Sequence, residues 1–171
     1  MPCTLFIAQS LDGFIAGPKG EIDFLDSVSA PGEDYGYADF LKSVDVIVMG
    51  RKTWELAKSF GAWPYAGKES WVLTRHATDL KPVADEYFAG FDAAIWRDVA
   101  RTKHVWLVGG GETNRLFFEN DLVDRIVLST VPVLLGSGLS CFPPSFPLSR
   151  WRLEKILSFP SGLVENFYAK V

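Results

Sequence analysis

The sequence has few of the residues from which several kinds of site are built. It contains two cysteines and two histidines among 171 residues, so the cysteines alone make neither a disulfide framework nor a zinc site. The net charge is −4, and no basic run marks a surface for nucleic acid. No uncharged apolar run has the length of a membrane span, and Asp12 interrupts the apolar stretch in which a signal peptide would lie. These absences predict a cytoplasmic protein that binds neither membranes nor nucleic acid.

Apolar and aromatic residues are abundant. Hydrophobic residues make up 48% of the chain and charged residues 22%, and there are six tryptophans and thirteen phenylalanines. This composition is ordinary for a globular protein with a substantial core. The length predicts one domain that spans residues 1–171.

Short apolar runs alternate with amphipathic segments along most of the chain. The expected strands lie at 4–8, 44–49, 71–73, 87–88, 105–108, 126–135, 151–157 and 164–169. The expected helices lie at 33–43, 51–58, 92–101 and after residue 111. Strands and helices alternate until the C-terminus, where only strands remain, so the sequence predicts an α/β fold. A mostly parallel central sheet would carry helices on both faces and end in an antiparallel C-terminal hairpin.

Three expected strands end in residues suited to an anionic ligand. The segment 105–117, VWLVGGGETNRLF, places a glycine triplet between a strand and a helix, and the segment 50–53, GRKT, adds basic residues to a second such turn. Thr74 and Arg75 follow a third strand. Helix N-termini and glycine turns bind phosphates, and ligands of α/β sheets lie at the carboxyl ends of the strands. The convergence favours a cofactor with phosphate groups, although each turn alone is also explained as a tight turn or a solvated helix start.

Three other polar residues have a structural and a functional interpretation. Asp12 precedes a glycine, so a role in the turn is favoured over catalysis. Asp34 stands near the start of the expected helix 33–43, where it either stabilises the helix N-terminus or takes part in the site. His76 has no evident partner, and a surface position is favoured.

Five segments resemble the dihydrofolate reductase superfamily, and within it the branch of the riboflavin-biosynthesis reductase, or RibD C-terminal domain. They read FIAQSLDGFIA, VIVMGRKTW, WVLTR, VWLVGGGETNRLFF and LVDRIVLSTVPVLLGSG, in the order of the family. The resemblance implies the three-layer dihydrofolate reductase-like fold and an NADPH-dependent reductase. The cofactor-binding residues that it implies are Ala8, Ile15, Ala16, Gly50, Arg51, Lys52, Thr53, Leu73, Thr74, Arg75, Gly109, Gly110, Gly111, Glu112 and Thr113.

The resemblance also implies a small heterocyclic substrate, as in 5-amino-6-(5-phosphoribosylamino)uracil reductase. The alternatives are a dihydrofolate or pteridine reductase, and a nucleotide-binding protein without turnover. Asp34 corresponds to the acidic residue that assists protonation in dihydrofolate reductases, and is the expected catalytic residue. The zinc motif of the deaminase domain that often accompanies such reductases is absent, so we expect a stand-alone reductase without a metal.

A homodimer is expected as well. The apolar strand 126–135 contains Pro132, which indicates an edge strand or a bulge. An exposed apolar edge promotes aggregation unless another segment or chain covers it. We expect a second copy to cover the segment 131–142, as the dimeric relatives imply. The alternative is that the C-terminal hairpin covers this edge within one chain.

Overall fold

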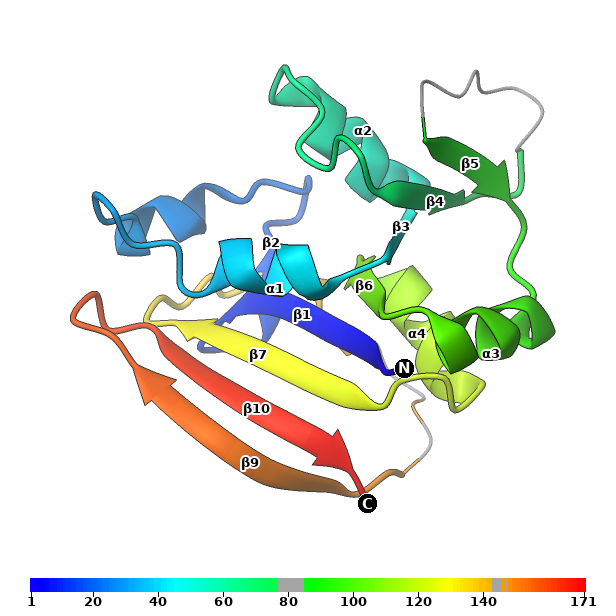
Figure 1. Ribbon diagram of the computed structural model, residues 1–171. Coiled ribbons are helices and arrows are strands. Elements are labelled where there is room, and N and C mark those ends of the chain that lie inside the picture. The colour runs from blue at the N-terminus through cyan, green and yellow to red at the C-terminus, as the bar shows by residue number, and fades with distance from the viewer. Residues whose placement is uncertain (77–84, 143–145, 147) are drawn as a thin grey trace.

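The protein has an eight-stranded sheet with two helices on each face (Figure 1). The computed structural model describes residues 1–76, 85–142, 146 and 148–171. The strands are β1 (Cys3–Ser10), β2 (Phe14–Ala16), β3 (Val46–Gly50), β4 (Glu69–Leu73), β5 (Glu86–Ala89), β6 (Val105–Gly109), β7 (Arg125–Val131), β8 (Leu139–Ser140), β9 (Trp151–Ser158) and β10 (Val164–Lys170). The helices are η1 (Asp23–Val28), α1 (Tyr37–Ser43), α2 (Arg51–Ser59), α3 (Ala93–Thr102) and α4 (Gly111–Glu119).

The strands of the large sheet follow the order β5-β4-β3-β6-β1-β7-β10-β9. The first six are parallel to one another. The last two form the antiparallel hairpin, in which β10 pairs with β7 and with β9. This arrangement confirms the predicted fold. The short strands β2 and β8 form a separate antiparallel pair, which the sequence analysis did not predict.

Alternation along the strands divides the core into two layers. On one face, Ile47, Met49 and Trp106 pack against residues of α1 and α2 such as Phe40 and Trp54. On the other face, buried residues of β1, β3 and β6 pack against Trp96 of α3 and Phe117 of α4. The parallel strands are therefore covered on both faces, as their continuous apolar runs predict.

The interpretation of β7 as an edge strand was wrong. β7 ends at Val131, one residue before Pro132, and lies between β1 and β10. The strand therefore ends before Pro132, so the proline removes no hydrogen bond from the pairing of β7 with its neighbours. The C-terminal hairpin covers β7 within one chain, which was the alternative considered. The outer strand is β9, where a register shift and the charged Arg152, Glu154 and Lys155 disfavour pairing with another chain.

The predicted helix 33–43 is also shorter than expected. It begins at Tyr37, and Tyr35 and Gly36 before it have positive φ angles of 56° and 76°. Such left-handed conformations cannot continue a right-handed helix. Asp34 therefore lies in the loop that precedes α1. Within the residues that the structure describes, no helix is both long and apolar enough to span a membrane.

Candidate functional site

The three strand ends identified in the sequence lie side by side. Gly50 at the end of β3 pairs with Leu73 at the end of β4, and Met49 pairs with Gly109 at the end of β6. Because these strands are parallel, the segments that follow them emerge at the same edge of the sheet. The structure therefore brings together the glycine triplet, the Gly50–Thr53 turn and the Thr74–Arg75 segment.

Two helices begin at this edge without side-chain caps. α2 starts after Gly50 and α4 after Gly110, and neither N-cap residue makes a side-chain hydrogen bond. The first backbone N–H groups of a helix have no partner within the helix. Both helices have nine residues, so each brings a full N-terminal dipole to the edge. The site thus offers two adjacent positions for negative charge.

The two helix starts contact each other. The Gly110 N–H donates a hydrogen bond of 3.1 Å to Thr53 Oγ1 in the first turn of α2. A Cβ atom on Gly50 would lie 2.7 Å from Thr113 Oγ1 in α4, so a larger residue at position 50 would displace the Thr113 hydroxyl. The Gly109–Gly110 peptide is cis, and Gly109 has a φ of 102° that favours glycine. Gly109 is therefore the glycine that the backbone conformation requires where the two helices meet.

The buried Asn114 supports the triplet from within α4. Its Nδ2 donates to the Cys141 carbonyl at 3.1 Å, and its Oδ1 lies 2.9 Å from where a Cβ on Gly109 would stand. In the described part of the chain this Oδ1 has no hydrogen-bond partner. A side chain on Gly109 would therefore collide with Asn114.

The central strand β1 is only partly covered beside this edge. Its first residues, Cys3 to Leu5, are buried, whereas Phe6 to Gln9 are only half-buried. A strand with neighbours on both sides is normally covered along its length in a parallel sheet. Ile7 faces the glycine triplet, since its Cδ1 lies 3.4 Å from where a Cβ on Gly109 would stand. Ala8, the next residue, points to the opposite face of the sheet, on which Phe6 packs against α1.

Asp12 fixes the loop between β1 and β2 against the loop after β7. Its carboxylate accepts hydrogen bonds from Ser10 Oγ at 2.6 Å, Leu135 N at 3.1 Å and Gly136 N at 2.7 Å. The Ser10 hydroxyl is the main cause that lowers the pKa of Asp12, and the two backbone donors add to it. This supports the predicted turn role.

The fixed loop presents Ile15 and Ala16 to the site. Ile15 reaches the glycine turn, where its Cδ1 lies 3.8 Å from where a Cβ on Gly110 would stand. Ala16 is buried in β2, whose partner β8 approaches so closely that a Cβ on Gly138 would lie 2.1 Å from the Ala16 carbonyl oxygen.

The basic residues at the edge are exposed. Arg51 forms an ion pair with Glu55 one turn along α2, with Nε and Oε1 separated by 2.8 Å. Lys52 and Arg75 are exposed, whereas Leu73 before Arg75 is buried. Thr74 bonds through its N–H to the Ala89 carbonyl and accepts at Oγ1 from the His76 N–H. Glu112, in the first turn of α4, pairs with Arg115 at 3.1 Å, which offsets an acidic charge near the turn.

Asp34 has the structural role that was considered as an alternative. Its oxygens accept hydrogen bonds of 3.0 Å from the backbone N–H groups of Gly36 and Ala38 at the start of α1. The residue is exposed. A part in protonation stays a prediction, which these contacts neither require nor test.

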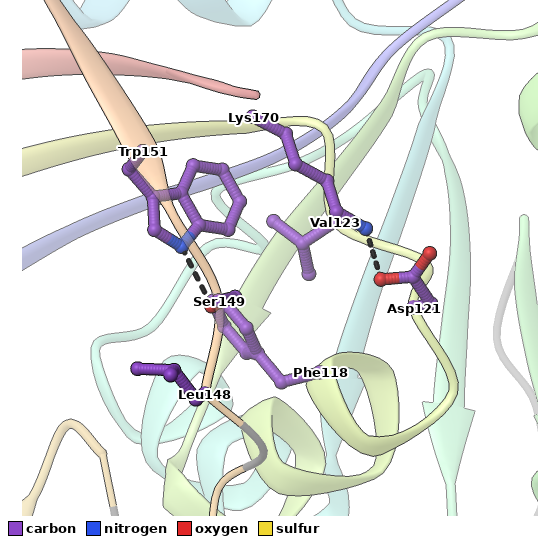
Figure 2. Close-up of a pocket in the computed structure, with 7 residues that line it drawn as sticks. All are labelled: Phe118, Asp121, Val123, Leu148, Ser149, Trp151 and Lys170. Atoms are coloured by element: carbon purple, nitrogen blue, oxygen red, sulfur yellow. Dashed lines mark hydrogen bonds and ion pairs between the residues drawn. The ribbon is translucent and has the colours of Figure 1, made fainter.

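A small pocket lies at the other end of α4 (Figure 2). It has a volume of about 70 Å³ and is lined by Phe118, Asp121, Val123, Leu148, Ser149, Trp151 and Lys170. Lys170 forms an ion pair with Asp121 across it, and the Trp151 indole donates to Ser149 Oγ at 2.9 Å. One water molecule needs about 10–15 Å³ of such space, so the pocket has room for a few waters and is too small for a dinucleotide.

Comparisons with known proteins identify the family of the chain. The sequence profile of the RibD C-terminal domain matches residues 95–164, which include β6, the glycine triplet, α4 and β7. The uncharacterized protein YwjB of Bacillus subtilis is 35% identical over 162 residues, with 91% of each chain covered. The chain belongs to the RibD C-terminal domain family. The sequence analysis did not identify Ser129 of β7 and Glu165 of β10, whose side chains form a hydrogen bond of 2.9 Å.

Solved structures of RibD-like proteins share the fold. A protein of Shewanella sp. PV-4, described as a "putative riboflavin biosynthesis protein", superimposes with a TM-score of 0.88 and 30% identity, covering 100% of this chain and 99% of the other. A deaminase/5-amino-6-(5-phosphoribosylamino)uracil reductase of Thermotoga maritima superimposes with a TM-score of 0.71 and 16% identity. This chain covers 57% of the Thermotoga protein, and at that identity the likeness shows the fold alone.

Proposed function

We propose that the protein is an NADPH-dependent reductase of a small heterocyclic substrate. The observation that carries the proposal is the contact between two uncapped helix N-termini at Gly50 and Gly110, joined by the bond from Gly110 to Thr53. Paired helix starts beside a glycine turn are suited to the two phosphates of a dinucleotide. The residues present therefore fit the cofactor that the family resemblance implies.

The two ends of the cofactor would contact different elements. Gly109 to Thr113 and Gly50 to Thr53 would hold the pyrophosphate through backbone N–H groups. Arg51 and Arg75, with Thr74, would bind the adenosine 2′-phosphate, since a guanidinium can donate two parallel hydrogen bonds to a phosphate. Ala8, Ile15 and Ala16 would position the nicotinamide along the half-buried part of β1.

NADPH supplies a hydride when it is bound. The contribution of the chain is orientation and exclusion of water along Ala8, where small and apolar side chains leave room for flat rings. The reductase activity in the name of the Thermotoga protein suggests the substrate class, a ribosylaminopyrimidine. A dihydrofolate or pteridine remains the alternative substrate, and cofactor binding without turnover the alternative function.

The test is a titration of the protein with NADPH, followed by tryptophan fluorescence. The chain has six tryptophans, and Trp54 adjoins Thr53 in α2. Saturable quenching supports the cofactor site, whereas no change at millimolar NADPH contradicts it. Oxidation of NADPH in the presence of aminopyrimidine or pteridine substrates then separates a reductase from a binding protein.

A further inference from the structure

The molecule contains a buried carboxyl group that the proposed cofactor site does not use. Glu165 in β10 is 2% exposed. Its Oε1 accepts a hydrogen bond of 2.9 Å from Ser129 Oγ in β7, and within the described residues its other oxygen has no hydrogen-bond partner. This oxygen keeps slight solvent contact, since Asn114 Oδ1 is the fully buried side-chain atom without a partner among the described residues. In a residue that is only 2% exposed, a carboxylate oxygen that no protein donor holds is poorly hydrated. The vacant acceptor therefore points to a donor that a ligand would bring.

Glu165 lies in the same row of the sheet as the half-buried part of β1. Ser129 pairs with Ala8 on one side and with Glu165 on the other. Side chains at paired positions of neighbouring strands point to the same face, so these three residues share one face. Two strand spacings separate Ala8 from Glu165, which is about 10 Å. A glutamate side chain together with a six-membered ring is long enough to bridge the distance between Glu165 and Ala8.

One cation lies near this carboxyl group. Lys155 in β9 occupies the same face two rows away, with its ammonium 5.2 Å from the centre of the Phe167 ring. Burial raises the pKa of Glu165, while the Ser129 hydroxyl and the Lys155 ammonium oppose that shift. Lys155 is exposed and does not occupy the vacant oxygen. The carboxyl group is therefore poorly compensated by the protein itself.

We propose that Glu165, held by Ser129, binds the substrate heterocycle through a pair of neighbouring N–H donors on its ring edge. A carboxylate accepts two parallel N–H bonds in one plane, and an aminopyrimidine presents such a pair. This inference rests on the proposed function, because it places the ring beside Ala8. Asp34 serves this purpose poorly, since both of its oxygens already accept backbone hydrogen bonds.

A structural role for Glu165 makes the opposite prediction for stability. If the bond to Ser129 mainly holds β7 to β10, Glu165→Gln lowers the melting temperature, because the amide oxygen of glutamine accepts a weaker hydrogen bond than a carboxylate does. If the carboxyl group is retained for a ligand, Glu165→Gln leaves the melting temperature unchanged or raises it, because an uncompensated buried charge is removed. Glu154→Gln is the matched control, since Glu154 lies in the adjacent strand in an exposed ion pair with Arg152.

The binding experiment uses calorimetry on the full chain with saturating NADP⁺. The probes are a diaminouracil with adjacent amino groups and isocytosine, which represent the pyrimidine and pteridine alternatives. N,N′-dimethyluracil, which has no N–H donor, is the reference. We expect Glu165→Gln to weaken binding of one of the first two probes by roughly tenfold to a hundredfold, as for a lost hydrogen bond to a charged group. Binding of NADPH should change less than about twofold.

The outcomes separate this inference from the proposed function. If the wild-type protein does not bind NADPH, the proposed function fails. If it binds NADPH but neither probe, or if Glu165→Gln binds both probes as well as the wild type, the assignment of Glu165 is overturned while the cofactor site stands. A fall in melting temperature with Glu165→Gln but not with Glu154→Gln also overturns it.

Discussion

The backbone N–H of Gly110 donates a hydrogen bond to the side chain of Thr53, although the two residues are 57 positions apart. This bond connects the first turn of α4 to the first turn of α2. Replacing Thr53 by alanine removes the acceptor, so we expect NADPH to bind about fivefold more weakly, as for the loss of about 1 kcal/mol. Thr53→Ser keeps the hydroxyl and should restore most of the affinity. Equal NADPH dissociation constants for the alanine and serine variants would contradict this role.

Gly110 tests whether the glycine turn contacts a ligand. A Cβ atom there would meet protein atoms no closer than 3.7 Å, from Thr53 Oγ1, which is ordinary contact. Gly110→Ala should therefore keep the circular dichroism spectrum of the wild type but lose NADPH affinity, because the added methyl group occupies the ligand side of the turn. Gly90→Ala is the control, since Gly90 faces open space. Undiminished NADPH affinity in Gly110→Ala would show that the triplet is only a turn.

Cofactor preference depends on Arg75 at the end of β4. We expect the wild type to bind NADPH more tightly than NADH. Arg75→Ala should bring the dissociation constants of the two cofactors closer together. The loss of a charge-assisted contact is worth about 1.5–3 kcal/mol, or roughly tenfold to a hundredfold in affinity. Competition titrations with both cofactors measure the ratio. A wild-type protein that binds the two equally would refute this prediction.

His104 is expected to make stability depend on pH. Burial is the main cause that lowers the pKa of this imidazole below its ordinary value of 6.5, and Thr4 and Ser43 bond to its two ring nitrogens at 2.9 and 3.0 Å. The unfolded chain therefore takes up the proton at a higher pH than the folded protein. The contribution of the neutral His104 to the free energy of unfolding is fully present above pH 6.5. It is lost as the pH falls toward the lowered pKa of His104 in the folded protein.

Chemical denaturation at several pH values between about 5 and 7 measures this effect. We expect the wild-type free energy of unfolding to fall with pH in this window, and the slope to be smaller in His104→Gln. Identical slopes in the two proteins would assign the pH dependence to other groups.

The homodimer remains a prediction, although β7 lies between β1 and β10 and is not an edge that a second copy could cover. The segment 131–142 does expose apolar side chains: Leu134 is 71%, Leu139 46% and Phe142 38% exposed. Light scattering should give twice the chain mass of 19.0 kDa, and Leu134→Glu should return the protein to the monomer by burying an unpaired charge. Leu148→Glu is a control, because Leu148 is 96% exposed outside this segment. A wild-type mass near that of one chain would exclude the dimer.

Local patterns were sufficient to predict most of the fold. The apolar runs of β1, β3 and β6 are continuous because both faces of these strands are covered by helices, and that continuity is visible in the sequence. The turns at Gly50 and Gly109 were identified for the same reason, since glycine, basic residues and helix starts are neighbours in the chain. These turns lie at one edge of the sheet because the strands that precede them are parallel neighbours.

Features that depend on distant pairing could not be predicted in this way. Pro132 was interpreted as a sign of an edge strand, whereas β10 satisfies the outer side of β7 and the ladder simply stops at Val131. Glu165 stands next to a second polar residue, Asn166, and a charged residue of a strand normally lies in solvent. Its pairing with Ser129, 36 residues earlier, places this carboxyl group in the same row of the sheet as Ala8.

The position of β1 in the middle of the sheet also determines when the protein can fold during its synthesis. This strand leaves the ribosome first, yet its neighbours β6 and β7 begin at Val105 and Arg125. Pairing over such sequence separations is slow and exposes apolar strands while it is incomplete. β10 arrives last and brings Glu165, so a nascent chain that has already formed the glycine turn still lacks its buried carboxyl group. A chain cut before β10 should therefore expose the outer side of β7 and aggregate.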